Sequence, residues 1–213
     1  MNPLNRKALR RAAMLVLTAV TALGLNVAQA KSVKQQNLVQ LMEVSDSILI
    51  GTVSKKSDGF QQGLPYTEIT LKVAQSVKGH HGETYTFRQF GLTAPKAMGN
   101  GRVNLMVTPA GWPTFAEGEQ VMLFLYKPAS QTGFQTTAGL NQGKFSIHGG
   151  RVANDMGNDA LFEGVSINAK LPRQQQDLVN QKGGAFEAAT FIALVREAVE
   201  QQWIEKGVMT NEN

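Results

Sequence analysis

The chain has 213 residues and no cysteine, which excludes disulfides, thiolate metal sites, a cysteine nucleophile and lipid attachment through a cysteine. Its formal net charge is +5, but four of the 21 basic residues and none of the 16 acidic residues lie before residue 31. The remainder therefore carries 17 basic and 16 acidic residues. This balance argues against a nucleic-acid-binding protein, which normally shows a clustered positive surface.

Residues 1–30 have the order of a secretory signal peptide. Four basic residues precede an apolar stretch, residues 12–25, which is too short to span a bilayer comfortably. Ala28-Gln29-Ala30 is an Ala-x-Ala motif, so we expect cleavage between Ala30 and Lys31. The pattern predicts an exported protein, periplasmic or extracellular, with no membrane span after cleavage. The alternative is an uncleaved membrane anchor.

A short amphipathic helix is predicted within residues 34–44. Leu38, Leu41 and Met42 recur at i, i+3 and i+4, the spacing of one helix face. We expect this helix to cap an antiparallel β-barrel, and residues 31–154 are predicted to form that barrel domain.

Two neighbouring strands are the clearest signal for the barrel. Ile69, Leu71 and Val73 alternate with polar residues, which predicts a strand with one buried and one exposed face. The preceding strand begins with an apolar run typical of burial on both faces, and Gly51 within it indicates a bulge. A polar turn over residues 56–65 is expected to join the two strands.

Further strands are predicted from alternating or continuous apolar residues, at residues 84–88, 102–107, 121–126, 134–138 and 144–148. The stretch 121–126 is apolar throughout, which is typical of a central strand buried on both faces. The last two strands are expected to form a hairpin around residues 139–143.

The composition changes after residue 154. Residues 155–184 are rich in Asn, Asp, Gln and Gly and are predicted to form a polar, flexible connection. Residues 185–206 are predicted to form an amphipathic helix with Ala188, Ile192, Val195, Val199 and Trp203 on one stripe. This helix either docks against the barrel or serves a partner, and we expect the tail after it to be disordered.

Part of this pattern resembles a known family. Residues 45–51, 66–73 and 77–79 resemble the N-terminal domain of tissue inhibitors of metalloproteinases and netrin-like modules. Residues 111–125 and 139–145 are similar to a group of uncharacterised exported bacterial proteins with the same barrel. The resemblance implies an OB-fold-like antiparallel barrel and suggests an exported metalloprotease as a partner.

One departure from that family limits what transfers. The animal inhibitors bind the protease zinc through an N-terminal cysteine that disulfides hold in place. The mature chain is expected to begin at Lys31, and it has no cysteine. No inhibitory residue therefore transfers, and the fold alone does not imply the function.

Motifs that would carry enzymatic chemistry are missing from the sequence. It contains no Gly-x-Ser-x-Gly, no P-loop and no His-Glu-x-x-His, so we expect no enzyme, no catalytic residue and no cofactor. The pair His80-His81 would need a third ligand to bind a metal ion, and a solvated turn is the alternative that we prefer. A Ser–His–Asp site is recognised by geometry, and nothing in the sequence favours one.

Four residues are candidates for contact with a partner: Trp112, Phe115, Asn141 and Gln142. The two aromatic residues either plug one end of the barrel or form an exposed contact patch, since exposed aromatic residues often anchor interfaces. The two amides either form a hairpin turn, for which the flanking glycines are suited, or extend that patch.

These observations predict an exported, non-enzymatic binding module that contacts a protein, an exported metalloprotease being one possible partner. An alternative is an oligosaccharide or envelope-component binder, because barrels of this type use one strand face for such ligands. A third interpretation is an exported hydrolase whose site the sequence does not reveal.

Overall fold

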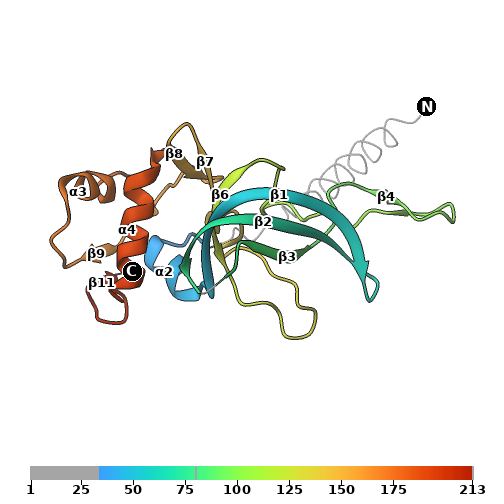
Figure 1. The fold of residues 1–213 in the computed structure, drawn as a ribbon, viewed down its shortest axis with the longest axis horizontal. Helices are drawn as coiled ribbons and strands as arrows, with labels where there is room; N and C mark the ends of the chain where they lie inside the picture. The colour runs from blue at the N-terminus through green and yellow to red at the C-terminus, as the bar shows by residue number, and fades with distance from the viewer. Residues whose placement is uncertain (1–33, 80, 213) are drawn as a thin grey trace, which may run out of the picture. The chain divides into compact units, whose positions relative to one another are not determined.

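An antiparallel sheet of seven strands dominates the computed structural model, which describes residues 34–79 and 81–212 (Figure 1). Its strand order is β10-β8-β7-β6-β1-β2-β3. In chain order these strands are β1 Ser47–Gln61, β2 Leu64–Lys78, β3 Thr84–Phe90, β6 Gln120–Leu125, β7 Lys144–His148, β8 Arg151–Asn154 and β10 Phe186–Glu187. The predicted signal peptide and its cleavage site between Ala30 and Lys31 lie outside the described residues.

The other elements of the described residues are three helices, a 3-10 turn and two small ribbons. They are α2 Leu38–Val44, α3 Arg173–Val179, α4 Ala188–Glu200, η1 Leu140–Gly143, the pair β4 Lys96–Ala97 and β5 Val103–Asn104, and the pair β9 Val165–Ile167 and β11 Met209–Asn211. The prediction of a mainly β fold with a short first helix and a C-terminal helix is confirmed at this level. No helix among the described residues is long and apolar enough to cross a membrane.

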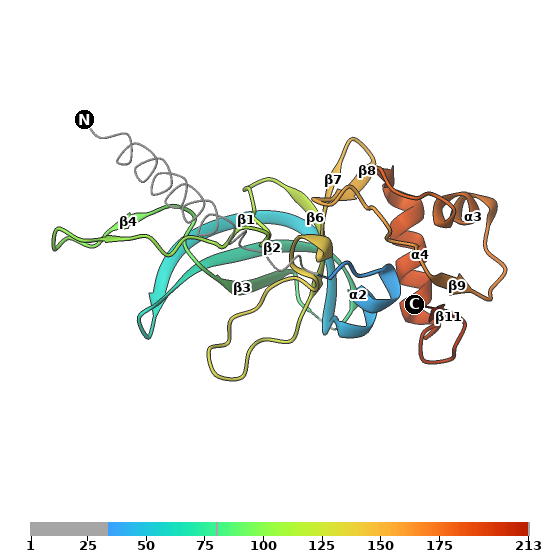
Figure 2. The ribbon, with the colours of Figure 1, turned by 180° about the vertical axis from the view of Figure 1, so that it is seen from behind.

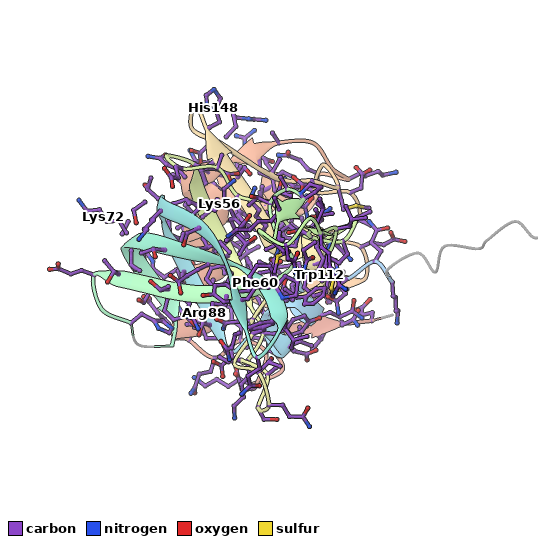
Figure 3. The ribbon with its side chains drawn as sticks, turned by 90° about the vertical axis from the view of Figure 1, so that its right-hand side faces the viewer. Lys56, Phe60, Lys72, Arg88, Trp112 and His148 are labelled. Carbon is purple, nitrogen blue, oxygen red and sulfur yellow. The ribbon has the colours of Figure 1, made fainter. Side chains whose placement is uncertain are left out.

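The alternation that predicted β2 matches its burial. Ile69 and Leu71 are fully buried, whereas Lys72 between Leu71 and Val73 is exposed. Figure 3 shows Lys72 extending outward from the body of the molecule. Strand β6 is buried on both faces, as its continuous apolar run predicted.

Two hydrophobic clusters occupy opposite faces of the central strands. Leu49 lies in one cluster with Ile69 and Leu71, and its neighbour Ile48 lies in the other, which also contains residues of α2 and α4. Neighbouring residues of a strand point to opposite faces, so one apolar run supplies both clusters.

The hairpin of β1 and β2 is longer than predicted. Only Gln62 and Gly63 separate the strands, and both have positive φ, 51° and 79°, as a two-residue hairpin turn requires. The expected turn over residues 56–65 is therefore wrong, because polar residues continue both strands where no core covers them. Gly51 does mark a bulge: the register shifts there, and a Cβ would lie 2.5 Å from the Lys72 carbonyl oxygen.

Two predicted strands belong elsewhere. Residues 102–107 form no strand of the main sheet: β5 within them pairs with β4, and Val107 forms an isolated bridge with Leu92. Residues 134–138 form no hairpin with β7, which pairs instead with β6 and with β8 across a turn at Gly149 and Gly150. Both glycines have positive φ, so the tight turn lies one strand later than expected.

Residues 134–138 instead connect two strands of the sheet that do not pair with each other. The Tyr126 amide donates to the Thr136 carbonyl at 3.0 Å, which attaches this segment to the end of β6. The Gln135 amide donates to the Arg88 carbonyl on β3 at 2.8 Å. Residues 134–138 are therefore hydrogen-bonded both to the residue that follows β6 and to β3.

The C-terminal part is more ordered than its composition predicted. Residues 155–184 contain β9 and α3, and they bury Leu161, Phe162, Leu171 and Leu178, so the prediction of a flexible connection is wrong. The tail also departs from expectation, since β11 pairs with β9. The apolar residues that attach this polar stretch to the core are few and widely spaced. No periodic pattern in the sequence therefore predicts their burial.

Helix α4 packs into the hydrophobic cluster that also contains residues of α2 and the main sheet. Its buried face contains Phe191, Leu194, Val195 and Ala198, so docking, rather than a free helix, is confirmed. The predicted stripe found three buried residues, Ala188, Val195 and Trp203, but it missed Phe191, Leu194 and Ala198 at the centre of the face. The Glu187 carboxylate accepts hydrogen bonds from the Ala189 and Thr190 amides and thereby caps the first turn.

Candidate binding surface

A two-stranded ribbon of β4 and β5 projects away from the sheet (Figures 1 and 2). We call residues 93–108 the arm. Five of the seven exposed large apolar side chains among the described residues lie on it: Met98, Val103, Leu105, Met106 and Val107. Leu105 is 72% exposed. Such a concentration of exposed apolar side chains is typical of an interaction surface.

The arm is also free of negative charge. It carries Lys96 and Arg102, and no acidic residue occurs between residues 84 and 116. The Lys96 ammonium lies 5.8 Å from the ring centroid of Phe60 on β1. The arm itself therefore combines exposed apolar side chains with a net positive charge.

Several hydrogen bonds fix the base of the arm. The Leu92 amide donates to the Met106 carbonyl at 3.0 Å, and the Thr108 amide donates to the Leu92 carbonyl at 2.8 Å. The Asp58 carboxylate accepts from the Thr93 hydroxyl at 2.6 Å and from the Thr93 amide. The apolar side chains are thus presented from an anchored position.

A pocket of about 390 Å³ lies at the base of the arm. Two of its polar lining side chains are already bonded within the protein: the Gln89 amide donates to the Pro113 carbonyl at 2.8 Å, and the Lys56 ammonium donates to the Phe115 carbonyl at 2.7 Å. This arm pocket offers shape and apolar surface, without an activated nucleophile or base.

Phe115 lies beneath this pocket and is 5% exposed. Its ring packs edge-on against Phe87, with 5.7 Å between centroids, and the Lys144 ammonium lies 5.3 Å from it. Phe115 is therefore part of a hydrophobic cluster, and its burial leaves little surface for a partner.

A second pocket, of about 270 Å³, lies on the other side of the loop that holds Trp112. Half of its lining residues are aromatic: Phe90, Trp112, Tyr126 and Phe134, with Lys127, Ala129, Gln135 and Thr136. Phe90 on β3 directly follows Gln89, which lines the arm pocket. Because neighbouring residues of a strand point to opposite faces, these two side chains line different pockets. We call this second depression the aromatic pocket.

The structure brings Trp112 and Asn141 together. Trp112 is partly exposed and its ring lies 6.5 Å from that of Phe90. With its amide nitrogen turned toward the neighbouring acceptors, Asn141 donates to the Trp112 carbonyl at 3.0 Å. Trp112 lines the aromatic pocket, and contact with a partner stays a prediction for both residues.

Gln142 has a different role, because it is buried. Its side-chain oxygen accepts from the Gln36 amide at 2.6 Å, and its nitrogen donates to the Lys34 carbonyl at 3.1 Å. The residue thereby attaches the first described segment to η1. Its buried position does not support contact with a partner.

A partly buried ion pair joins Glu119, the residue before β6, to Lys144 of β7. The Lys144 ammonium and the Ser146 hydroxyl donate to one oxygen of Glu119, at 2.6 Å and 2.7 Å. Burial raises the pKa of Glu119, but hydrogen bonds from Lys144, Ser146 and the Ala116 amide outweigh it and hold the pKa below its ordinary value. The carboxylate is fully engaged, so this cluster stabilises the fold and does not act as a catalytic base.

Ser47 and His81 form a pair that resembles a nucleophile and a base. His81 Nε2 lies 3.0 Å from Ser47 Oγ. The nearby Asp46 carboxylate accepts from the serine, at 3.4 Å, rather than orienting the histidine ring. Ser47 is also buried, so the pair lacks both the third member of a triad and access for a substrate.

The metal hypothesis for the histidine turn finds no support in the described region. His80 lies outside it, and the His81 ring packs edge-on against Tyr85 at 4.6 Å. Within residues 34–79 and 81–212, no group of three or more His, Cys, Asp or Glu side chains is placed to hold a metal ion.

Comparison with known proteins gives no family for the chain: no protein-family model, no curated protein and no solved structure matches it. The sequence reasoning missed the exposure of the arm and three of the four rings of the aromatic pocket. The absence of acidic residues between 84 and 116, together with Leu105-Met106-Val107 after a glycine-rich turn, was the available signal for the arm.

Proposed function

We propose that the protein is an exported, non-enzymatic module that binds another protein, and that the arm is its main contact surface. One observation carries the proposal: exposed apolar side chains are concentrated on a single projecting ribbon whose base is anchored by hydrogen bonds. Burying such side chains against a partner stabilises a complex by roughly 25 cal/mol per Å² of apolar surface before the costs of association.

The barrel is part of the proposal. We infer an OB-fold-like arrangement in which β6-β1-β2-β3 curl and residues 134–138 close the open side. The hydrogen bond from the Gln135 amide to the Arg88 carbonyl supports this closure, as does the bond from the Tyr85 hydroxyl to the Gln135 side chain at 2.8 Å. The order of residues 1–30 supports export to the periplasm or the exterior.

An exported metalloprotease is one partner that the family resemblance suggests. The contact would be unlike that of the animal inhibitors, because this chain lacks the N-terminal cysteine they use. The positive charge of the arm favours a partner whose contact surface is neutral or acidic.

Site-specific photocrosslinking in cells that export the protein tests the proposal. A photoreactive residue at Leu105 is expected to yield one discrete adduct, because a partner covers the arm. The same residue at Lys72, exposed on β2, is the matched control and is expected to yield none. An adduct of equal yield at both positions, or at neither, contradicts the proposal.

A further inference from the structure

The aromatic pocket gathers partly exposed rings from distant segments. Phe90 ends β3, Trp112 lies in the loop before β6, Tyr126 directly follows β6, and Phe134 lies in the segment that meets β3. None of the four rings is fully buried, although the fold buries other aromatic side chains completely. Four rings that share one depression form an apolar receptor surface.

The hydrogen-bonding groups of this pocket are mostly occupied. The Gln135 side chain donates to the Tyr126 carbonyl at 2.7 Å and accepts from Tyr85 at 2.8 Å. The Thr136 hydroxyl donates to the Gln89 side chain at 3.1 Å, and the Tyr126 hydroxyl accepts from the Gly139 amide at 3.1 Å. The pocket therefore has few polar groups left to recognise a ligand.

Two donors remain. The Trp112 indole N–H has no partner among the described residues, in contrast to the Trp203 indole, which donates to Gln201 at 3.0 Å. Lys127 is exposed at the rim, and no acidic side chain lines the pocket. A ligand should therefore present apolar faces, an acceptor for the indole and a negative charge near the rim.

We propose that the aromatic pocket binds an extended, proline-rich segment with an acidic flank, supplied by the protein partner; this inference rests on the proposed function. Proline rings lie flat against aromatic side chains, and a polyproline II backbone leaves its carbonyls free to accept from an indole N–H. An oligosaccharide would need several convergent donors and acceptors, which this pocket has already committed to internal bonds.

The two tryptophans of the chain allow a direct test by NMR of the indole N–H signals. The probe is a ten-residue peptide of two glutamates followed by eight prolines, and the control peptide has alternating Gly and Ser in place of the prolines. The Trp112 signal is expected to shift and saturate with the probe only. Trp203 is 3% exposed and serves as the internal reference that does not move.

Two variants test the assigned donors, with a fluorescently labelled probe. Trp112→Phe keeps a ring but removes the N–H, and is expected to weaken binding by about two- to tenfold. Lys127→Gln is expected to weaken it by about two- to fivefold, and only at low salt. Unchanged affinity in both variants overturns the assignment.

The alternative occupant has its own probe. If a tetramer of N-acetylglucosamine shifts the Trp112 signal and the proline peptide does not, the proposal is overturned in favour of a sugar site. A Trp112 signal that moves with neither probe overturns it as well. Each result is independent of crosslinking at Leu105, so the proposed protein contact through the arm stands or falls separately.

Discussion

Strand β2 and the arm carry the same pattern of apolar residues at every second position, but only one of them is covered. Leu71 on β2 is fully buried beside Ile69, whereas Leu105 on the arm is 72% exposed. Strand β2 lies between β1 and β3, and each strand of the arm pairs only with the other. An alternating pattern of apolar residues therefore indicates which side chains need burial. It does not indicate whether the surface that buries them belongs to the same chain or to another molecule.

The largest expected effect is the difference in stability between a substitution on β2 and the same substitution on the arm. Leu71→Asp places an unpaired carboxylate in the core, which costs several kcal/mol against a total of about 5–15 kcal/mol for a domain. Leu105→Asp is expected to change the unfolding free energy by no more than about 0.5 kcal/mol, as is the surface control Lys72→Asp. Thermal unfolding of the three variants checks this, and equal shifts for Leu71→Asp and Leu105→Asp would contradict the comparison.

The next effect concerns the two aromatic residues of one loop. Phe115→Ala removes a buried ring and is expected to cost about 3–5 kcal/mol of stability. Trp112→Ala should cost less than half as much, because its ring is partly exposed in the aromatic pocket. Denaturant unfolding of both variants measures the difference. A larger cost for Trp112→Ala would show that Trp112 is the plug.

A smaller effect depends on pH. Glu119→Gln is expected to cost about 1.5–3 kcal/mol at neutral pH, because it removes charged hydrogen bonds from Lys144. The folded state holds the pKa of Glu119 below its ordinary value of 4.5, so this contribution is present above that value. It is lost as the pH falls through the lower, folded-state pKa.

Unfolding free energies of wild type and Glu119→Gln, measured from pH 7 to pH 3, test this linkage. The two curves are expected to converge in acid. Curves that stay parallel over this range would show that the carboxylate has the same pKa in the folded and unfolded states.

The smallest expected effect on stability comes from substituting exposed methionines, and here the yield of the crosslinked adduct distinguishes the arm from other exposed apolar surface. Met106 on the arm is 46% exposed and Met156 elsewhere is 48% exposed, which makes them a matched pair. Met106→Gln and Met156→Gln should both leave the melting temperature unchanged. Only Met106→Gln is expected to reduce the yield of the adduct formed at Leu105, and an equal reduction by both would argue against a localised contact.

The sequence predicted the parts of the fold whose signal is local. Period-two alternation located Ile69 and Leu71, helical spacing located Leu38 and Leu41, and a glycine within a strand located the bulge at Gly51. The same alternation misplaced residues 102–107, because no sequence pattern states whether a partner strand exists. The last hairpin was predicted around residues 139–143, one turn before the β7–β8 hairpin that the structure contains. Glycines lie at both turns, so the sequence does not distinguish them.

The candidate binding surface was less predictable. Trp112 was identified because tryptophan is rare and lies beside Gly111 and Pro113. Phe90, Tyr126 and Phe134 were not, because only long-range folding brings them to one pocket. Phe115 and Gln142 carried the same local signal as Trp112 and Asn141 but are buried, and composition does not distinguish the two outcomes.

Methionine oxidation footprinting tests most directly whether a partner covers the arm. Met98 and Met106 of the arm are 43% and 46% exposed, and Met156 away from it is 48% exposed. In the purified protein all three should oxidise at similar rates, since oxidation follows exposure. In exporting cells, Met98 and Met106 are expected to be protected relative to Met156. Equal oxidation of the three in cells would contradict the account, because the arm would then be as open there as in isolation.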